Sequence, residues 1–180
     1  MSDGEADTGS EEYRARRAEH KFLQAAAPTL HTMPFFQMSP SQQAYLTKKC
    51  HSGGEGDLPV VVCFLDSDNW CLVTTRRVHW SCEGDYHSLL YKDIKQVGWS
   101  AGPKAARKRT YVDQIDMWIE TDEGKVRTKS ASPWFFIFEK SGTRHELKLE
   151  IGSPQAAIWD AIDMLIRLEQ IHPRVEQDRV

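Results

Sequence analysis

The chain has 180 residues, of which 40% are hydrophobic and 27% charged, and its formal net charge is −3. This is the composition of an ordinary globular domain, and it excludes a fibrous or wholly disordered chain. Positive and negative residues are nearly balanced along the whole length, which disfavours a dedicated nucleic-acid binder, because such proteins carry several phosphate-neutralising Lys and Arg on one face.

The sequence has no segment typical of membrane insertion or secretion. No apolar run approaches the ~20 residues of a membrane span. The stretch Met1 to Arg17 is polar and acidic at its start and lacks the apolar region of a signal peptide. We therefore expect a cytoplasmic protein.

The first 57 residues are predicted to form an N-terminal extension. Met1 to Gly9 has the composition of a disordered tail. Ser10 to Ala27 favours a helix, but its apolar stripe is thin, so we expect it to be weakly docked or marginal on its own. A second helix is indicated by Ser39 as N-cap and Pro40 at the first helical position. The glycine-rich stretch 52–57 then ends the extension.

Beyond residue 57 the pattern changes to short β-rich runs separated by turn residues. The run at 134–139 is compatible with a strand or a buried helical turn, and its strand-like neighbour favours a strand. For the strand that begins at Trp70, Ser81 is an alternative end. The predicted strands are Val60 to Leu65, Trp70 to Val78, His87 to Tyr91, Ile94 to Trp99, Asp113 to Glu120, Lys125 to Lys129, Trp134 to Glu139 and Thr143 to Glu150.

One strong amphipathic helix is predicted at the end of this β domain, over 153–171. Ser153 is the expected N-cap and Pro154 the first helical residue. Asp163 and Arg167 are spaced for a supporting ion pair. The residues 172–180 form a charged tail. The apolar face of the helix contains Ile158, Trp159, Ile162, Leu165 and Ile166.

The order of elements predicts a mainly β domain with added helices. About seven short antiparallel strands followed by one amphipathic helix form a small β-barrel or sandwich, whose open end the helix covers. Together with the N-terminal extension, this gives three parts: residues 1–57, the β domain 58–171 and the tail 172–180.

Two segments of the β domain resemble bacterial pleckstrin-homology-like (PH-like) domains. Trp70 to Val78 is similar to their second strand, and Tyr91 to Val97 to a later "tyr-x-asp-ile-x-x-val" segment. The resemblance covers 58–171 and implies the same antiparallel barrel or sandwich with a C-terminal helix. It implies no single function, because this barrel serves lipid binding, peptide binding and oligomer scaffolding. The acidic loop 66–69 departs from the basic loop of phosphoinositide-binding members.

The four cysteines and the histidines give no catalytic or metal-binding motif. Cys50, Cys63, Cys71 and Cys82 contain no CxxC pair, and Cys63 and Cys71 fall in apolar runs, so reduced packing thiols are favoured over a zinc site. His79, His87 and His145 lie on predicted strands, where two of them could approach each other. We therefore expect no enzyme activity, no cofactor and no metal.

The neighbouring Arg76 and Arg77 lie within the predicted strand that begins at Trp70. Strand alternation places one guanidinium on each face, so the two cannot form a single anion clamp. A structural role is favoured, with one arginine paired to a carboxylate such as Asp93.

Aromatic residues are the candidate partner-binding residues. In the strand 113–120, Trp118 is expected to face away from the aliphatic side chains, so it is either covered by the extension or part of an exposed patch. The extension carries its own apolar cluster, which should pack on the β domain or on a partner. Its members are Leu30, Met33, Pro34, Phe35, Phe36 and Met38.

A basic loop offers a second kind of candidate site. Lys104, Arg107, Lys108 and Arg109 lie close together in a chain that is otherwise balanced, so an anionic partner would bind there. The alternative is a solvated loop whose charges add solubility.

The sequence therefore predicts a non-catalytic binding module. The favoured partners are another protein or a second copy of the chain, bound through an exposed strand edge or through Trp118, Phe35 and Phe36. The alternative is peripheral binding of an anionic membrane surface or a nucleic acid through the loop 104–109.

Overall fold

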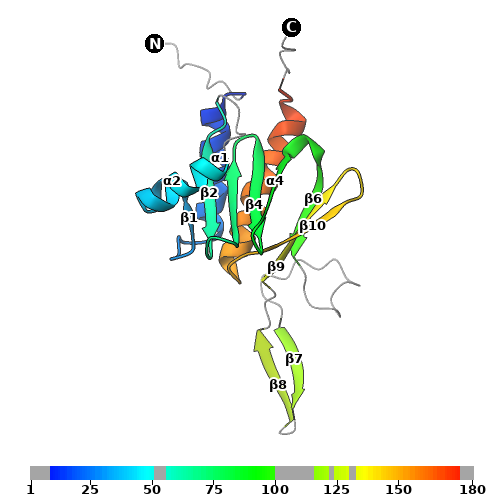
Figure 1. The fold of residues 1–180 in the computed structure, drawn as a ribbon. Helices are drawn as coiled ribbons and strands as arrows, with labels where there is room; N and C mark the ends of the chain where they lie inside the picture. Colours follow the sequence, from blue (N-terminus) through cyan, green and yellow to red (C-terminus); the bar gives the residue numbers. More distant parts are fainter. Residues whose placement is uncertain (1–8, 51–55, 100–115, 122–123, 130–132, 175–180) are drawn as a thin grey trace, which may run out of the picture.

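The computed structural model describes residues 9–50, 56–99, 116–121, 124–129 and 133–174, and these contain two main antiparallel sheets (Figure 1). The first sheet has the order β1-β2-β3-β4-β5 and the second the order β10-β9-β6, while β7 and β8 pair with each other. The described strands form no closed barrel. Their bounds are β1 Thr32–Pro34, β2 Pro59–Phe64, β3 Trp70–Thr74, β4 Arg77–Cys82, β5 Asp85–Leu90, β6 Ile94–Trp99, β7 Asp116–Thr121, β8 Gly124–Lys129, β9 Trp134–Glu139 and β10 Arg144–Lys148.

The two main sheets and two helices share one hydrophobic core. Strand alternation decides which side chains enter it: Cys71 and Val73 of β3 belong to this core, whereas Trp70 and Leu72 belong to a second cluster on the outer face of the first sheet. From the second sheet, Phe135, Ile137 and Leu147 complete the main core.

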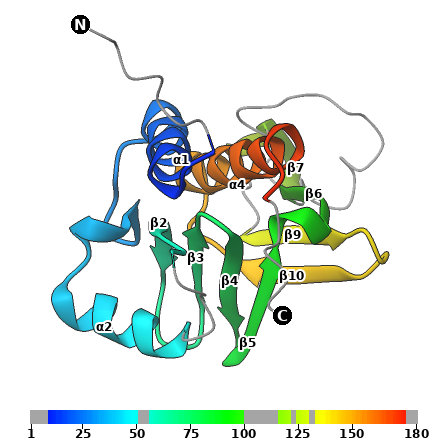
Figure 2. The ribbon, with the colours of Figure 1, turned by 90° about the horizontal axis from the view of Figure 1, so that it is seen from above.

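Helix α1 (Glu11–Ala25) and helix α4 (Ser153–Ile171) pack side by side against this core (Figure 2). Ala18 and Phe22 of α1 are fully buried. The expectation of a weakly docked first helix is therefore wrong. Its apolar stripe is thin in the sequence because alanines form part of it, and these small side chains bring α1 close to α4 while Phe22 fills the core.

The part of the N-terminal extension that follows α1 covers the outer face of the first sheet. Helix α2 (Pro40–Lys49) begins as expected, with the Ser39 side chain accepting a hydrogen bond from the Gln42 backbone. The 3-10 turn η1 (Phe35–Gln37) precedes it. Leu46 of α2 and Met38, which lies between η1 and α2, pack on the sheet and form the second cluster with Val62, Trp70 and Leu72.

The predicted strand from Trp70 to Val78 is two strands. β3 ends at Thr74 and β4 begins at Arg77, and the two pair across the bend at Thr75 and Arg76. No glycine, proline or asparagine marks this bend in the sequence. It is held by a separate segment: Thr75 N–H donates to the Leu58 carbonyl and Arg76 N–H to Asp57 Oδ1.

The other predicted elements agree closely with the structure. The segment 134–139 is strand β9, and β7 begins at Asp116, with 113–115 outside the described residues. A short 3-10 turn, η2 (Tyr91–Asp93), separates β5 from β6. Helix α4 has the expected extent, but its N-cap is Gly152, with φ 94°, rather than Ser153.

Candidate functional site

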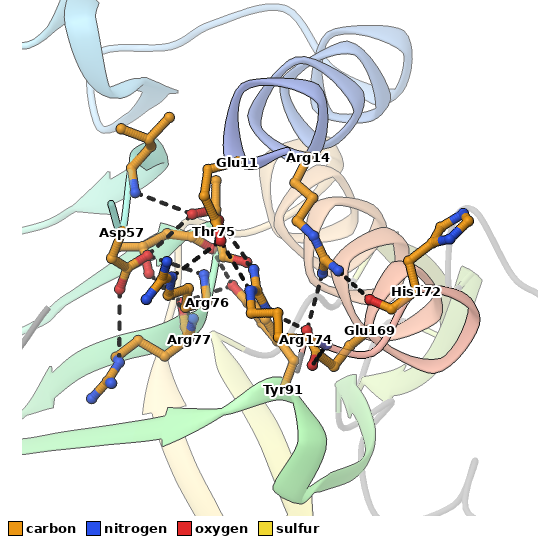
Figure 3. A network of polar contacts seen from close by, with 12 residues as sticks. Glu11, Arg14, Asp57, Thr75, Arg76, Arg77, Tyr91, Glu169, His172 and Arg174 are labelled. Carbon is orange, nitrogen blue, oxygen red and sulfur yellow. Dashed lines mark hydrogen bonds and ion pairs between the residues drawn. The ribbon is translucent and has the colours of Figure 1, made fainter. Parts of the chain in front are cut away.

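A network of charged side chains joins both ends of the described chain to the first sheet (Figure 3). Arg174 donates to Glu11 of α1 at 2.9 Å, to Glu169 of α4 and to the Thr75 carbonyl at 2.8 Å. Arg14 donates to Glu169 at 3.0 Å and also to the His172 carbonyl. The network thereby holds α1, the end of α4 and the β3–β4 bend together.

The arginines of this network stabilise the Glu11 carboxylate. Burial by itself raises the pKa of Glu11, but the hydrogen bonds from Arg174 and Thr75 and the charges of Arg174 and Arg76 outweigh it and hold that pKa below its usual value. Desolvation lowers the pKa of Arg14. These groups are engaged with one another, which is the arrangement of a structural clamp.

A second charged pair lies next to the network. Asp57 Oδ1 accepts from Arg76 N–H at 3.0 Å, and Arg77 Nε lies 3.7 Å from Asp57 Oδ2. Arg76 Nε donates to Glu11 at 3.1 Å. The structural role expected for the two arginines is thus supported, but the suggested partner Asp93 is wrong: the carboxylates are Glu11 and Asp57, which the tertiary fold brings to the bend.

An open hollow of about 500 Å³ borders the network. Its lining includes Lys92, Lys140, Glu169 and Arg174. Arg174 already binds two carboxylates and a carbonyl, so its guanidinium is not available to an incoming anion.

Two of the strand histidines do approach each other, as expected. The rings of His87 and His145 are 5.8 Å apart, and both contact the ring of Trp80. His145 Nε2 is 2.5 Å from Glu139 Oε1, and this hydrogen bond lowers the pKa of Glu139. Ring packing and one hydrogen bond account for this cluster without a chemical role.

β5 is one of the two edge strands of the first sheet. β5 pairs with β4 on one side, and within the described residues no strand pairs with its other side. The residues Asp85 to His87 are exposed, and Tyr86 keeps 40% of its surface accessible. Tyr86 was not among the predicted site residues, although the alternation of Tyr86 and Ser88 places both on the outer face.

The predicted partner-binding residues have different environments. Phe35 packs against the second hydrophobic cluster, so the expected aromatic cluster of the extension is partly used within the chain. Phe36 remains 66% exposed. Trp118 lies opposite Arg127 in the β7–β8 register, and its side chain is outside what the structure describes. The basic residues Lys104, Arg107, Lys108 and Arg109 also lie outside the described residues.

The cysteines are free thiols. Cys63 and Cys71 are buried, as predicted, and face each other across β2 and β3. Among the described residues, no group of three or more His, Cys, Asp or Glu side chains is placed to hold a metal ion. None of the described helices combines the length and apolarity needed to cross a bilayer.

Comparison with protein-family models, curated proteins and solved structures finds no match to this chain.

Proposed function

We propose that this chain is a non-catalytic protein-interaction module that binds its partner through the free edge of β5. The observation that carries the proposal is the position of β5 at the end of the five-stranded sheet, with an exposed first half. An unpaired edge presents a row of backbone N–H and C=O groups, to which an extended segment of another chain can add as a further strand.

The other edges of the two main sheets carry features that discourage such pairing. β1 has three residues and ends in Pro34, which has no backbone N–H to donate. Charged residues alternate along β10. In β6 the register shifts between Ile94 and Gln96, and the Val97 carbonyl accepts a hydrogen bond from Trp159.

β5 lacks these features. It has six residues, contains no proline and carries one charged side chain, Asp85, at its start. Its exposed Tyr86 provides an amphipathic contact of the kind that is enriched at protein interfaces. These properties favour pairing with a partner strand.

The partner to which we commit is a second copy of the chain. Two β5 strands related by a two-fold axis would pair in antiparallel orientation and join the two five-stranded sheets. The low charge of β5 supports this pairing, because no row of like charges would be placed opposite itself.

The PH-like fold is part of the same proposal. The strands β2 to β5 and then β6, β9 and β10 form two antiparallel meanders, and α4 follows them. This order supports the resemblance carried by Trp70 to Val78 and Tyr91 to Val97, which form β3, the start of β4, η2 and β6. Oligomer scaffolding and peptide binding are both functions that this resemblance allows.

Sedimentation velocity across a range of protein concentrations tests the proposal. The parent chain should form a dimer whose fraction rises with concentration. Tyr86→Lys places a positive charge on the edge and should leave a folded monomer. The matched control is Ile151→Lys, which changes another exposed apolar residue away from β5 and should still dimerise. A parent chain that stays monomeric, or variants that behave alike, would contradict the proposal.

The alternative, binding of anionic lipid or nucleic acid through 104–109, has a separate test. Replacement of Lys104, Arg107, Lys108 and Arg109 by Ser should abolish binding to anionic vesicles or nucleic acid. Such binding should also collapse as salt rises, because screening limits charge interactions to about 8 Å at 0.15 M. If the parent binds neither at low salt, this alternative fails.

A further inference from the structure

The turn before β5 determines which backbone groups of this strand point away from β4. Glu83 and Gly84 join β4 to β5 as a two-residue turn, and both have positive φ, 54° and 91°. This is the type I′ turn that is typical of β-hairpins. In such a hairpin the two residues that flank the turn, Cys82 and Asp85, form a hydrogen-bonded pair. The backbone N–H and C=O of Asp85 therefore point toward β4.

Hydrogen-bonded and non-hydrogen-bonded pairs alternate along an antiparallel ladder, which extends this result to the rest of β5. Because Asp85 belongs to a hydrogen-bonded pair, His87 and Leu89 do so as well. The Tyr91 N–H, which donates to the Arg76 carbonyl at 3.3 Å, continues the same series. The outward backbone groups belong to the alternate residues of β5, which are Tyr86, Ser88 and Leu90.

A two-fold axis allows few registers for two β5 strands. Outward groups must face outward groups, and these lie two residues apart, so the axis passes through a residue. An axis at Ser88 places Ser88 opposite its own copy and Tyr86 opposite Leu90 of the other copy, which pairs all three outward residues. An axis at His87 leaves Leu90 without a β5 partner, and an axis at Leu89 leaves Tyr86 without one.

The side chains favour the same register. With the axis at Ser88, the exposed aromatic ring of Tyr86 faces the aliphatic side chain of Leu90, and such cross-strand pairs are stabilising. Asp85, the one charged residue of β5, then lies beyond the paired stretch. An axis at His87 would instead place the Asp85 carboxylate opposite the apolar Leu89.

We propose that two copies of the chain pair β5 with β5 in the register that places Ser88 opposite its own copy. The contacts that determine self-recognition are then the Ser88 pair at the axis and the two pairs of Tyr86 with Leu90. This inference rests on the proposed function, in which β5 binds a second copy, and it goes further by assigning the residues that face one another.

Isotope-filtered NMR on a mixture of ¹³C-labelled and unlabelled parent chain tests the register. In a non-hydrogen-bonded pair the two Cα atoms are only about 4.5 Å apart, so their Hα atoms are in contact. We expect this intermolecular contact between His87 and Leu89 of the other copy. A contact of His87 with His87, or of Leu89 with Leu89, would overturn the register and leave the proposed function standing. A monomeric chain, or a dimer without intermolecular contacts at β5, would overturn both.

Opposite charges placed on facing residues give a second test. Tyr86→Lys should leave a monomer, and the further change Leu90→Glu should raise the affinity of the dimer about tenfold, because two opposite-charge pairs then form between the copies. The matched control combines Tyr86→Lys with Ser88→Glu. It should stay monomeric, because two like charges then meet at the axis, whereas an axis at His87 would make it the restored variant.

Sedimentation velocity measures the dimer fraction of each variant, and thermal melts establish that the variants are folded. Restoration by Ser88→Glu, or no gain from Leu90→Glu in a folded double variant, would overturn the register. If a double variant does not fold, the intermolecular contacts of the parent chain decide.

Discussion

Arg14 on α1 and Glu169 on α4 are 155 residues apart in the chain, and their side chains form an ion pair of 3.0 Å. The Arg14 side chain is only 1% exposed. This contact lies beside the buried face of α1 that contains Ala18 and Phe22. The first helix is therefore an integral part of the β domain, held by both a charge pair and core packing.

We expect Arg14→Ala to lower the free energy of unfolding by about 3 kcal/mol, because it removes one partner of a buried pair. Glu169 keeps Arg174, which places the loss at the lower end of the usual range. Urea unfolding measures it. The control is Arg167→Ala, which breaks an exposed pair with Asp163 and should cost no more than about 0.5 kcal/mol. Equal losses in the two variants would contradict the buried pair.

Two adjacent residues of α1, one buried and one exposed, test how this helix packs. Phe22→Ala should cost about 3–5 kcal/mol, because Phe22 is fully buried and its loss leaves a cavity. Leu23→Ala should cost less than about 1 kcal/mol, because Leu23 is 44% exposed. Chemical denaturation of the two variants separates them. Similar stabilities would mean that α1 does not occupy the core.

The lowered pKa of His79 predicts that the stability of the fold depends on pH. Burial, and then the charge of Arg77, lowers its pKa from 6.5 to about 4 in the folded chain. The unfolded chain therefore binds a proton at higher pH than the folded chain does, and stability is lost as pH falls from about 6.5 to about 4. His79→Phe should flatten this part of the stability curve. An imidazole that titrates near 6.5 in the folded protein, measured by NMR, would contradict this prediction.

Glu11 affects the stability of the fold at lower pH than His79 does. Its pKa is lowered in the folded chain, so its contribution is fully present above its ordinary value of 4.5 and is lost as pH falls below that. We expect Glu11→Gln to lower stability at neutral pH and to weaken the acid dependence below about pH 4.5. Acid titration of both proteins, followed by circular dichroism, checks this. An unchanged acid dependence would show that Glu11 is not engaged with Arg174.

Local patterns predicted the elements whose signals lie within a few residues. Ser39 and Pro40 marked the start of α2, and the apolar stripe with Ile158 and Ile162 marked α4. The turn at Glu83 and Gly84 has a local signal too: both residues adopt positive φ, for which glycine is suited.

Features that depend on distant segments were not predicted. The bend at Thr75 is made by Asp57 and Leu58, which lie outside the local sequence. The partners of Arg174 are likewise separated along the chain, up to Glu11 at the opposite end.

Amide hydrogen exchange of β5, measured residue by residue at low and high protein concentration, tests the strand-edge proposal most directly. Amides that point toward β4 should be protected at both concentrations. If two β5 strands pair, the outward amides between Asp85 and Leu90 should exchange quickly in dilute solution and become protected as concentration rises. Outward amides that exchange quickly at every concentration would contradict the claim that β5 is the interaction edge.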